Sequence, residues 1–455
     1  MMRNADIPAR RSGKRKKMKN KVKIIGGGLA GCEAAWQVAK AGYEAELYEM
    51  RPEKSSPAHK TDKFAELVCS NSLKADRLDS AAGMLKEEMR IFGSLCMECA
   101  DKCRVPAGGA LAVDREEFSR LVTEKINENP LITVIHGEVK SIPEGESVII
   151  AAGPLVSDSL AEDIRKKYGN SLSFFDAAAP IVSGESIDMS RAFCQSRYDR
   201  GGEDDYINCP MNREEYESFY NELVNARRAV LHEFEKGKNV YEGCMPIEIM
   251  ASRGADTMRF GPLKPVGLTD PVTNKRPWAV LQLRKENVAG SAYNLVGFQT
   301  NLIFSEQKRV FSMIPALKNA EFLRYGVMHR NTFINSPEIL NGDFQTRDRK
   351  GLFFAGQITG VEGYMESASS GIMAGYNAVR VLEGRETLIL PEESMIGALS
   401  RYISSPGSGK FQPMGANFGV LPPLAEKIRD KKQRYSLLAK RGLDKTTKIF
   451  LLNRG

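Results

Sequence analysis

Several features that define whole classes of protein are missing from this chain of 455 residues. No apolar run approaches the roughly 20 residues that a membrane-spanning helix needs, and no segment has the charged, apolar and small-residue order of a secretory signal peptide. No internal repeat is evident. The eight cysteines are scattered along the chain, so we expect reduced thiols in a cytoplasmic protein rather than a secreted disulfide scaffold.

Positive charge is also scarce outside the first residues. The formal net charge is +8, but residues 1–23 hold ten Lys or Arg and one Asp, which is +9. The rest of the chain therefore carries 8 − 9 = −1, and the basic character says little about what the folded part binds. We expect residues 1–20 to form a disordered basic extension. It either contacts nucleic acid without sequence preference or is an upstream extension, with translation starting at Met18.

A glycine motif near the start organises the rest of the chain. Residues 21–36 have the pattern of a short apolar strand, a glycine turn and a helix of small residues. Gly26, Gly28 and Gly31 fit G-x-G-x-x-G, in which the three glycines permit a tight turn, close approach to a pyrophosphate, and close packing of the helix on the strand. The first amides of that helix would face the phosphates.

The context of this motif supports dinucleotide binding over an ordinary βαβ unit. The helix, at about residues 30–41, is followed by a second strand at 44–49. That strand ends in Glu49, which lies 18 residues after Gly31, close to the expected position of a carboxylate that bonds ribose hydroxyls.

Two later segments predict that the same fold is interrupted and then resumed. Apolar strands are expected at 147–153 and 351–356, and each ends in small residues, as a buried parallel strand does beside a cofactor. A small-residue helix after the second strand would turn backbone amides toward a second phosphate. We therefore predict a nucleotide-binding fold formed by residues 21–182 and 321–455, with an inserted α+β domain at 183–320.

Three cysteines have a spacing that is found in metal sites. Cys96, Cys99 and Cys103 could supply thiolate ligands if a fourth ligand converged on them. The helical periodicity extends upstream to Leu85, however, and cysteine also serves as a small apolar residue. We therefore predict a buried helix face and no metal.

Taken together, the motif at 26–31 with Glu49 and the strands at 149–153 and 352–356 resemble the two-dinucleotide-binding flavoproteins related to glutathione reductase. Those proteins bind FAD across the strand ends. The resemblance implies an α/β, Rossmann-like FAD-binding domain of the glutathione reductase type, split by the inserted domain.

Longer motifs resemble the TrmFO family, the folate- and FAD-dependent tRNA (uracil-5-)-methyltransferases. The resemblance covers nearly everything after Met18, whereas the basic extension and the cysteine triplet are departures from it. The motifs lie at residues 57–73, 105–115, 176–182, 206–211, 242–248 and 354–364.

This resemblance implies methylation of C5 of the T-loop uridine, at position 54 of tRNA, with 5,10-methylenetetrahydrofolate as carbon donor and tetrahydrofolate as product. Reduced FAD would be the reductant, and NAD(P)H would reload it. Uracil C5 becomes nucleophilic when a thiolate adds to C6, and a base must then remove the C5 proton. The family gives the nucleophile role to the cysteine of Glu-Gly-Cys-Met-Pro, here Cys244, and places the cysteine of Val-Cys-Ser-Asn, here Cys69, near the flavin as the base.

Other positions are candidates on the same resemblance. His59 and His329 are candidate folate or phosphate contacts, although a lone histidine is more often structural, and Cys209 is expected to be structural. The expected FAD contacts are Gly26, Gly27, Gly28, Leu29, Ala30, Gly31, Glu49, Gly356 and Gln357. Basic residues that would line an RNA path, or simply form a solvated surface, are Arg253, Arg259, Lys264, Lys275, Arg276, Arg284 and Lys285.

Three further functions remain open at the level of sequence. The same chemistry could act on a ribosomal RNA uridine. The fold also suits a flavin oxidoreductase for a small molecule, which would leave Cys244 without a role, or a non-catalytic RNA-binding flavoprotein. We expect a monomer that binds neither membrane nor metal.

Overall fold

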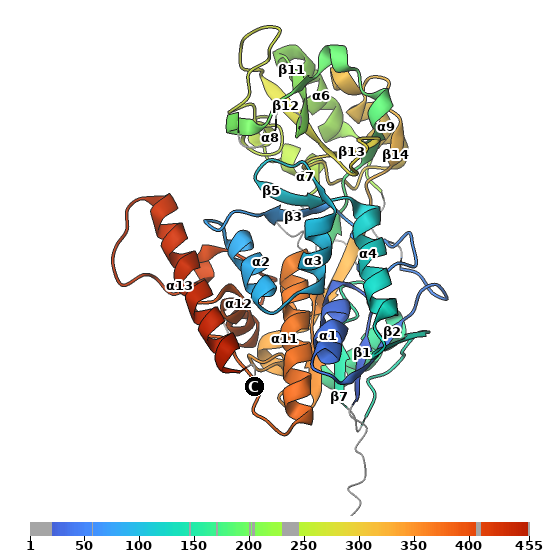
Figure 1. Ribbon diagram of the computed structural model, residues 1–455. Helices are drawn as coiled ribbons and strands as arrows, with labels where there is room; N and C mark the ends of the chain where they lie inside the picture. Colours follow the sequence, from blue (N-terminus) through green and yellow to red (C-terminus); the bar gives the residue numbers. More distant parts are fainter. Residues whose placement is uncertain are drawn as a thin grey trace, which may run out of the picture.

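The computed structural model describes residues 21–56, 58–144, 147–169, 172–199, 202, 205–229, 245–405 and 411–453. The predicted basic extension and Cys244 lie outside these ranges. The described residues form two units, with the cofactor-type unit below and the inserted unit above in Figure 1.

A five-stranded parallel sheet forms the centre of the lower unit. Its order is β16 (Leu352–Phe354), β7 (Ser147–Ile150), β1 (Lys21–Ile25), β2 (Glu44–Glu49) and β6 (Ile132–His136). The central strands are apolar because both faces of the sheet are covered. Strand β16 pairs with β7, so a strand from late in the chain completes a sheet that begins at residue 21. The prediction of a split α/β fold is thereby confirmed.

Helices pack on and around this sheet, and two of them approach unusually closely. They are α1 (Leu29–Lys40), α2 (Ala81–Ile91), α3 (Leu95–Lys102), α4 (Arg115–Glu128), α5 (Asp158–Tyr168), α10 (Ser336–Ile339), α11 (Tyr364–Leu382), α12 (Met395–Ser404) and α13 (Lys431–Leu452). Helices α1 and α11 lie side by side. A Cβ at Gly371 would lie 2.1 Å from the Ala30 oxygen, and one at Gly375 would lie 2.6 Å from the Ala34 oxygen. These two glycines of the late helix therefore allow it to pack closely on α1.

The cysteine triplet lies in the core. Its periodic face is divided between α2 and α3, because the chain turns at Gly93 with φ +67°. The Glu33 carboxylate accepts hydrogen bonds from the first-turn amides of α3, including that of Cys96 at 2.9 Å. Cys96 and Cys99 are fully buried and Cys103 is 4% exposed, so the predicted buried face is confirmed. Within the described ranges, no three His, Cys, Asp or Glu side chains are grouped as metal ligands.

The upper unit has its own sheet and core. Its antiparallel strands follow the order β10 (Phe193–Cys194), β11 (Tyr206–Met211), β12 (Ala279–Lys285), β13 (Ala292–Leu295), β9 (Ile181–Ser183) and β14 (Phe322–Arg324). Its helices are α6 (Arg213–Asn225), α7 (Ile247–Ala251), α8 (Thr257–Phe260) and α9 (Phe304–Phe311). Their apolar faces form a cluster separate from the core of the lower unit.

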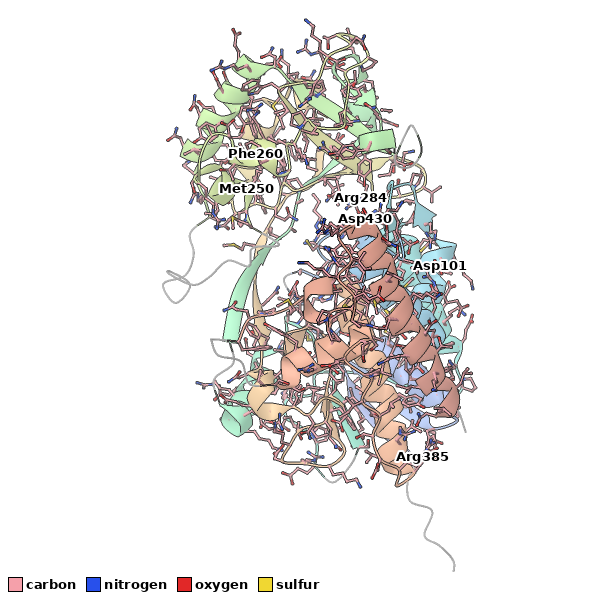
Figure 2. All side chains as sticks on the ribbon, turned by 90° about the vertical axis from the view of Figure 1, so that its left-hand side faces the viewer. Asp101, Met250, Phe260, Arg284, Arg385 and Asp430 are labelled. Carbon is pink, nitrogen blue, oxygen red and sulfur yellow. The ribbon has the colours of Figure 1, made fainter. Side chains whose placement is uncertain are left out.

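Two further sheets join the units. One is the antiparallel set β3 (Ser72–Ala75), β5 (Ala110–Val113) and β4 (Arg104–Val105). The other pairs β8 (Leu172–Ala177) with β15 (Met328–Phe333), the two segments in which the chain leaves and re-enters the lower unit (Figure 2). In the part of the chain that the structure describes, no helix is long and apolar enough to cross a membrane.

Candidate active site

A cavity opens where the strands of the parallel sheet end. The space that it encloses is about 1050 Å³, part of which is open to solvent. Its walls come from the turn after β1, the end of β2, the loop after β7 and the turn after β16. The predicted positions that line it are Gly26, Gly27, Gly28, Leu29, Ala30, Glu49, Gly356 and Gln357.

The glycine turn after β1 has the geometry of a phosphate cradle. Gly26 has φ +110°, and a Cβ there would lie 2.4 Å from the Ala151 oxygen of the neighbouring strand end. At Gly28 a Cβ would meet no described atom within 4 Å, so this backbone borders open space at the start of α1. Gly31 lies behind the cavity, where a Cβ would be 1.8 Å from the Gly26 oxygen. The first amides of α1, which receive no side-chain cap within the described residues, thus lie beside this open space.

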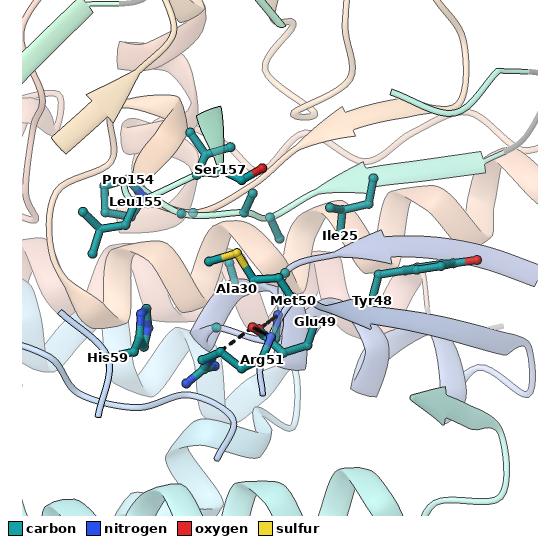
Figure 3. Close-up of a pocket in the computed structure, with 18 of the residues that line it drawn as sticks. Ile25, Ala30, Tyr48, Glu49, Met50, Arg51, His59, Pro154, Leu155 and Ser157 are labelled. Atoms are coloured by element: carbon teal, nitrogen blue, oxygen red, sulfur yellow. Dashed lines mark hydrogen bonds and ion pairs between the residues drawn. The ribbon is translucent and has the colours of Figure 1, made fainter. Parts of the chain in front are cut away.

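Glu49 is held at the cavity wall by charge and hydrogen bonds. Its carboxylate accepts from the Gly27 amide at 2.8 Å, and from the Arg51 amide and Nε at 3.0 and 2.9 Å. Figure 3 shows Glu49 and Arg51 joined in this way. Burial by itself would raise the pKa of Glu49, but the bonds from Arg51 outweigh it and lower the pKa. Arg51, which is 2% exposed, was missed by the sequence reasoning; its one signal is its place two residues after the acid.

The opposite wall comes from the late part of the chain. Gly356 has φ +85°, and its amide donates to the Ser370 hydroxyl at 2.6 Å. The Gln357 side chain donates to Glu362 at 2.7 Å. The turn after β16 is therefore anchored on α11, beside the start of α1.

His59 also lines the cavity. Its Nδ1 lies 2.6 Å from the Ser56 hydroxyl, and Figure 3 places it near Arg51. Burial, and then the Arg51 charge, lower the pKa of His59, which favours the neutral ring. The side chain of the second histidine candidate, His329, lies outside the described residues.

Cys69 belongs to the loop at residues 67–71 that precedes β3. The Cys69 and Ser70 amides donate to the Tyr364 hydroxyl at 2.8 and 3.2 Å. Tyr364 begins α11 and lines the cavity. The cysteine loop is thus tied directly to a wall of the cavity.

Three arginines from distant parts of the chain surround this loop. Arg115 of α4 donates to the Leu67 oxygen and, at 3.4 Å, to the Cys69 oxygen. The remaining two come from the upper unit: Arg324 donates to the Val68 oxygen at 2.7 Å, and Arg284 donates to the Ser70 hydroxyl at 2.7 Å and to the Asn71 side chain at 2.9 Å.

This environment corrects one sequence-based interpretation. Arg284 was a candidate for a surface RNA path, but it is only 6% exposed and lies at the junction between the units (Figure 2). The sequence contained no local signal for the cluster, because its members lie up to 257 positions apart, from Leu67 to Arg324. Of the remaining path candidates, Lys275 and Arg276 are exposed, whereas Arg259 stacks 3.7 Å above the Trp278 ring.

The residues that follow Cys244 are firmly anchored, although Cys244 itself is outside the described residues. The Ile247 amide donates to the Gln299 oxygen at 2.7 Å. Buried Glu248 accepts from the Asn301 amide at 2.8 Å and from the Thr300 hydroxyl at 2.9 Å. Cys209, in contrast, is fully buried in β11, and burial raises its pKa, in keeping with a structural role.

Comparison with known proteins gives a consistent result. A family model described as "Glucose inhibited division protein A" matches residues 21–386. The protein "Methylenetetrahydrofolate--tRNA-(uracil-5-)-methyltransferase TrmFO" of Ligilactobacillus salivarius is 58% identical over 433 residues, 95% of this chain and 99% of that one. The protein of the same name from Pelotomaculum thermopropionicum is 58% identical over 93% of this chain and 97% of its own. The solved structure of Aquifex aeolicus GidA in its form II crystal has a TM-score of 0.68 at 15% identity, covering 95% of this chain and 73% of that one, which supports the fold alone.

Proposed function

The chain belongs to the TrmFO family of methylenetetrahydrofolate–tRNA-(uracil-5-)-methyltransferases, and from that premise we propose that it methylates C5 of a tRNA uridine beside the cavity described above. The observation that supports the proposal is the hydrogen bonding between the Cys69 loop and the wall of the cavity. The loop of Cys69 is held by Tyr364, which is itself a wall of the cavity. A reactive thiol and a cofactor in that cavity would therefore be neighbours.

The cavity fits FAD. The open space at Gly28, the free first turn of α1 and the carboxylate of Glu49 suit a pyrophosphate and an adjacent ribose. Gln357 and Tyr364 would hold the far part of the cofactor. When bound, FAD supplies the electrons that convert the transferred one-carbon unit into a methyl group, and NAD(P)H restores them.

The steps at uracil are assigned to cysteines. The Cys244 thiolate adds to C6, and the electron pair of the C5–C6 double bond moves to an enolate. Carbon C5 then attacks the one-carbon unit from 5,10-methylenetetrahydrofolate. The Cys69 thiolate takes the C5 proton and becomes a thiol, and tetrahydrofolate leaves with the electron pair of its bond to the transferred carbon, which becomes an exocyclic methylene on C5. Once this carbon has received the hydride equivalent that bound reduced FAD would supply, the C5–C6 double bond reforms and Cys244 leaves as a thiolate. The target would be the T-loop uridine at position 54, which must be flipped out of its stack at a cost of a few kcal/mol.

Functions without methyl transfer have less support. A small-molecule oxidoreductase or a non-catalytic flavoprotein is not favoured, because relatives that match nearly the full chain carry the tRNA methyltransferase name. The seven cysteines that the structure describes are reduced thiols, which with a tRNA substrate favours a cytoplasmic enzyme. Strands β9 and β14 belong to the sheet of the upper unit, so the insertion extends slightly beyond the expected 183–320. We assign residues 21–180 and 325–455 to the FAD-binding domain and residues 181–324 to the inserted domain.

The test uses purified protein with its visible spectrum recorded, incubated with unmodified tRNA transcript, methylenetetrahydrofolate and NAD(P)H. Mass spectrometry of the nucleosides should find 5-methyluridine at one T-loop position. Cys244→Ser and Cys69→Ser should each remove this product while leaving flavin absorbance, whereas Cys194→Ser, at an exposed position on β10, should not. A yellow wild-type protein that methylates ribosomal RNA but not tRNA would overturn the substrate assignment, and full activity in Cys244→Ser would overturn the thiolate mechanism.

A further inference from the structure

The cluster of charged side chains around the Cys69 loop has more positive than negative groups. It contains the guanidinium groups of Arg115, Arg284 and Arg324. The Glu286 carboxylate pairs with Arg115 at 2.8 Å and is among the strongest influences on the pKa of all three arginines. Three cations and one carboxylate leave an excess of two positive charges.

This excess positive charge destabilises the folded protein because it is largely buried. Arg284 and Glu286 are each 6% exposed. Burial is the largest influence on the pKa of Arg284 and of Arg324, and it lowers both. A buried cation without a counterion is destabilising, so the cluster favours any neighbour that can become an anion.

Cys69 is the neighbour best able to do so. Besides Glu286, the groups able to carry negative charge among the strongest influences on these arginines are Cys69, Tyr206 and Tyr364. Burial raises the pKa of both tyrosines, whereas an ordinary thiol already ionises near pH 8.5. A negative charge on Cys69 favours the protonated form of each of the three arginines, and the attraction is reciprocal.

We propose that Arg284 and Arg324, both supplied by the inserted unit, are positioning residues that hold the Cys69 loop in place and keep Cys69 as a thiolate. Their hydrogen bonds to the Val68 oxygen and the Ser70 side chain flank Cys69 on both sides. The inserted unit thus sets the charge state of a side chain that belongs to the cofactor unit. The inference rests on the proposed role of Cys69 as a base, because a thiolate can accept the C5 proton and a thiol cannot.

The test measures the rate of iodoacetamide alkylation at Cys69 against pH, by peptide mass spectrometry of the full protein. In the wild type the apparent pKa should lie below about 8.5. Arg324→Met should raise it by about one unit or more, which makes alkylation near pH 7 about tenfold slower, while Arg324→Lys should shift it less because the charge remains. Cys194 is the internal reference in each sample, and Arg191→Met, in an exposed pair with Glu215, is the matched control.

Two features separate charge control from a general loosening of the loop. The plateau rate at high pH should stay unchanged in Arg324→Met, because it reports access rather than ionisation. Arg284→Met provides a second variant if the first does not fold. An ordinary pKa in the wild type, or a change of plateau without a change of pKa, would overturn the inference. Alkylation needs neither tRNA nor folate, so a low pKa in a protein that makes no 5-methyluridine would count against the proposed function alone.

Discussion

Replacing Gly31 with alanine tests whether the glycine turn is built by packing or by ligand contact. The new Cβ would lie 1.8 Å from the Gly26 oxygen and 3.0 Å from the Gly26 carbonyl carbon. Both partners are backbone, so neither can rotate away. To reach a separation of 3.0 Å, the helix and the turn must move apart by 3.0 − 1.8 = 1.2 Å.

The expected loss of stability follows from two opposing effects. Overpacking of this kind costs about 1–3 kcal/mol, and a clash between two backbone segments belongs at the upper end. Alanine favours a helix over glycine by about 1 kcal/mol. We therefore expect the free energy of unfolding of the flavin-free protein to fall by about 2 kcal/mol, and FAD affinity to fall as well, because the cradle is displaced.

Gly28→Ala is the matched comparison. Gly28 has φ −78°, which alanine adopts freely, and its added Cβ would meet no described atom within 4 Å. The free energy of unfolding without flavin should therefore change by less than about 0.5 kcal/mol. FAD affinity should fall at least about tenfold, or roughly 1.4 kcal/mol, because the Cβ fills the space through which the pyrophosphate approaches.

The assays are urea denaturation of the flavin-free variants and fluorescence titration with FAD. An equal loss of stability in both variants would refute the distinction between a packing glycine and a contact glycine. Normal FAD affinity in Gly28→Ala would refute the placement of the pyrophosphate at the start of α1.

Three further substitutions test buried polar groups, two of them charged residues and one a tyrosine hydroxyl. Burial raises the pKa of Glu88 to about 7 from an ordinary 4.5, so the folded protein keeps a proton that the unfolded chain releases. The free energy of unfolding should therefore fall by about 3 kcal/mol between about pH 4.5 and 7. In Glu88→Gln, urea titrations should no longer show this fall. Arg51→Met leaves Glu49 buried and unpaired, so it should cost about 3–5 kcal/mol at pH 7 and less near pH 4, measured the same way. Tyr364→Phe removes the acceptor of the Cys69 amide, at about 1–3 kcal/mol, and should lower kcat for tRNA methylation while KM for tRNA stays unchanged.

Each of these results has a control and an opposite outcome. Lys54→Met breaks an exposed pair with Glu138 and should change stability little; an equal cost there would show that burial of Arg51 is not the cause. A pH slope that persists in Glu88→Gln would exclude Glu88 as its source. Unchanged kcat in Tyr364→Phe would show that this hydroxyl does not position the cysteine loop.

Local patterns allowed accurate prediction where neighbours in sequence are neighbours in space. The helix expected at about 30–41 is α1, Leu29–Lys40, because a strand, a glycine turn and a small-residue run are contiguous. The late strand expected at 351–356 is β16, Leu352–Phe354; it was assigned to the nucleotide-binding fold because its apolar run and terminal glycine are typical of a buried parallel strand. The helical face of the cysteine triplet was predicted as buried, but its division at Gly93 was not, because a positive φ leaves no mark on periodicity.

The roles of individual polar residues were harder to predict. The seven basic residues proposed for an RNA path included Arg284, which is buried. Composition does not distinguish an arginine that faces solvent from one that faces another domain. The amides at the start of α11 were predicted to face a second phosphate, and this stays a prediction. The packing role of Gly371 and Gly375, which allow α1 to approach, was not predicted.

What the sequence determined by itself is the dinucleotide-binding motif, the split α/β fold and the family. Each can be recognised from short runs of contiguous residues, because the structure of such runs depends on local backbone freedom and on residue spacing. What only the tertiary structure decided is the setting of Cys69. Its surroundings are assembled from α4, β12, β14 and the first residue of α11, and their charges act on one another only because folding removes the water that would screen them.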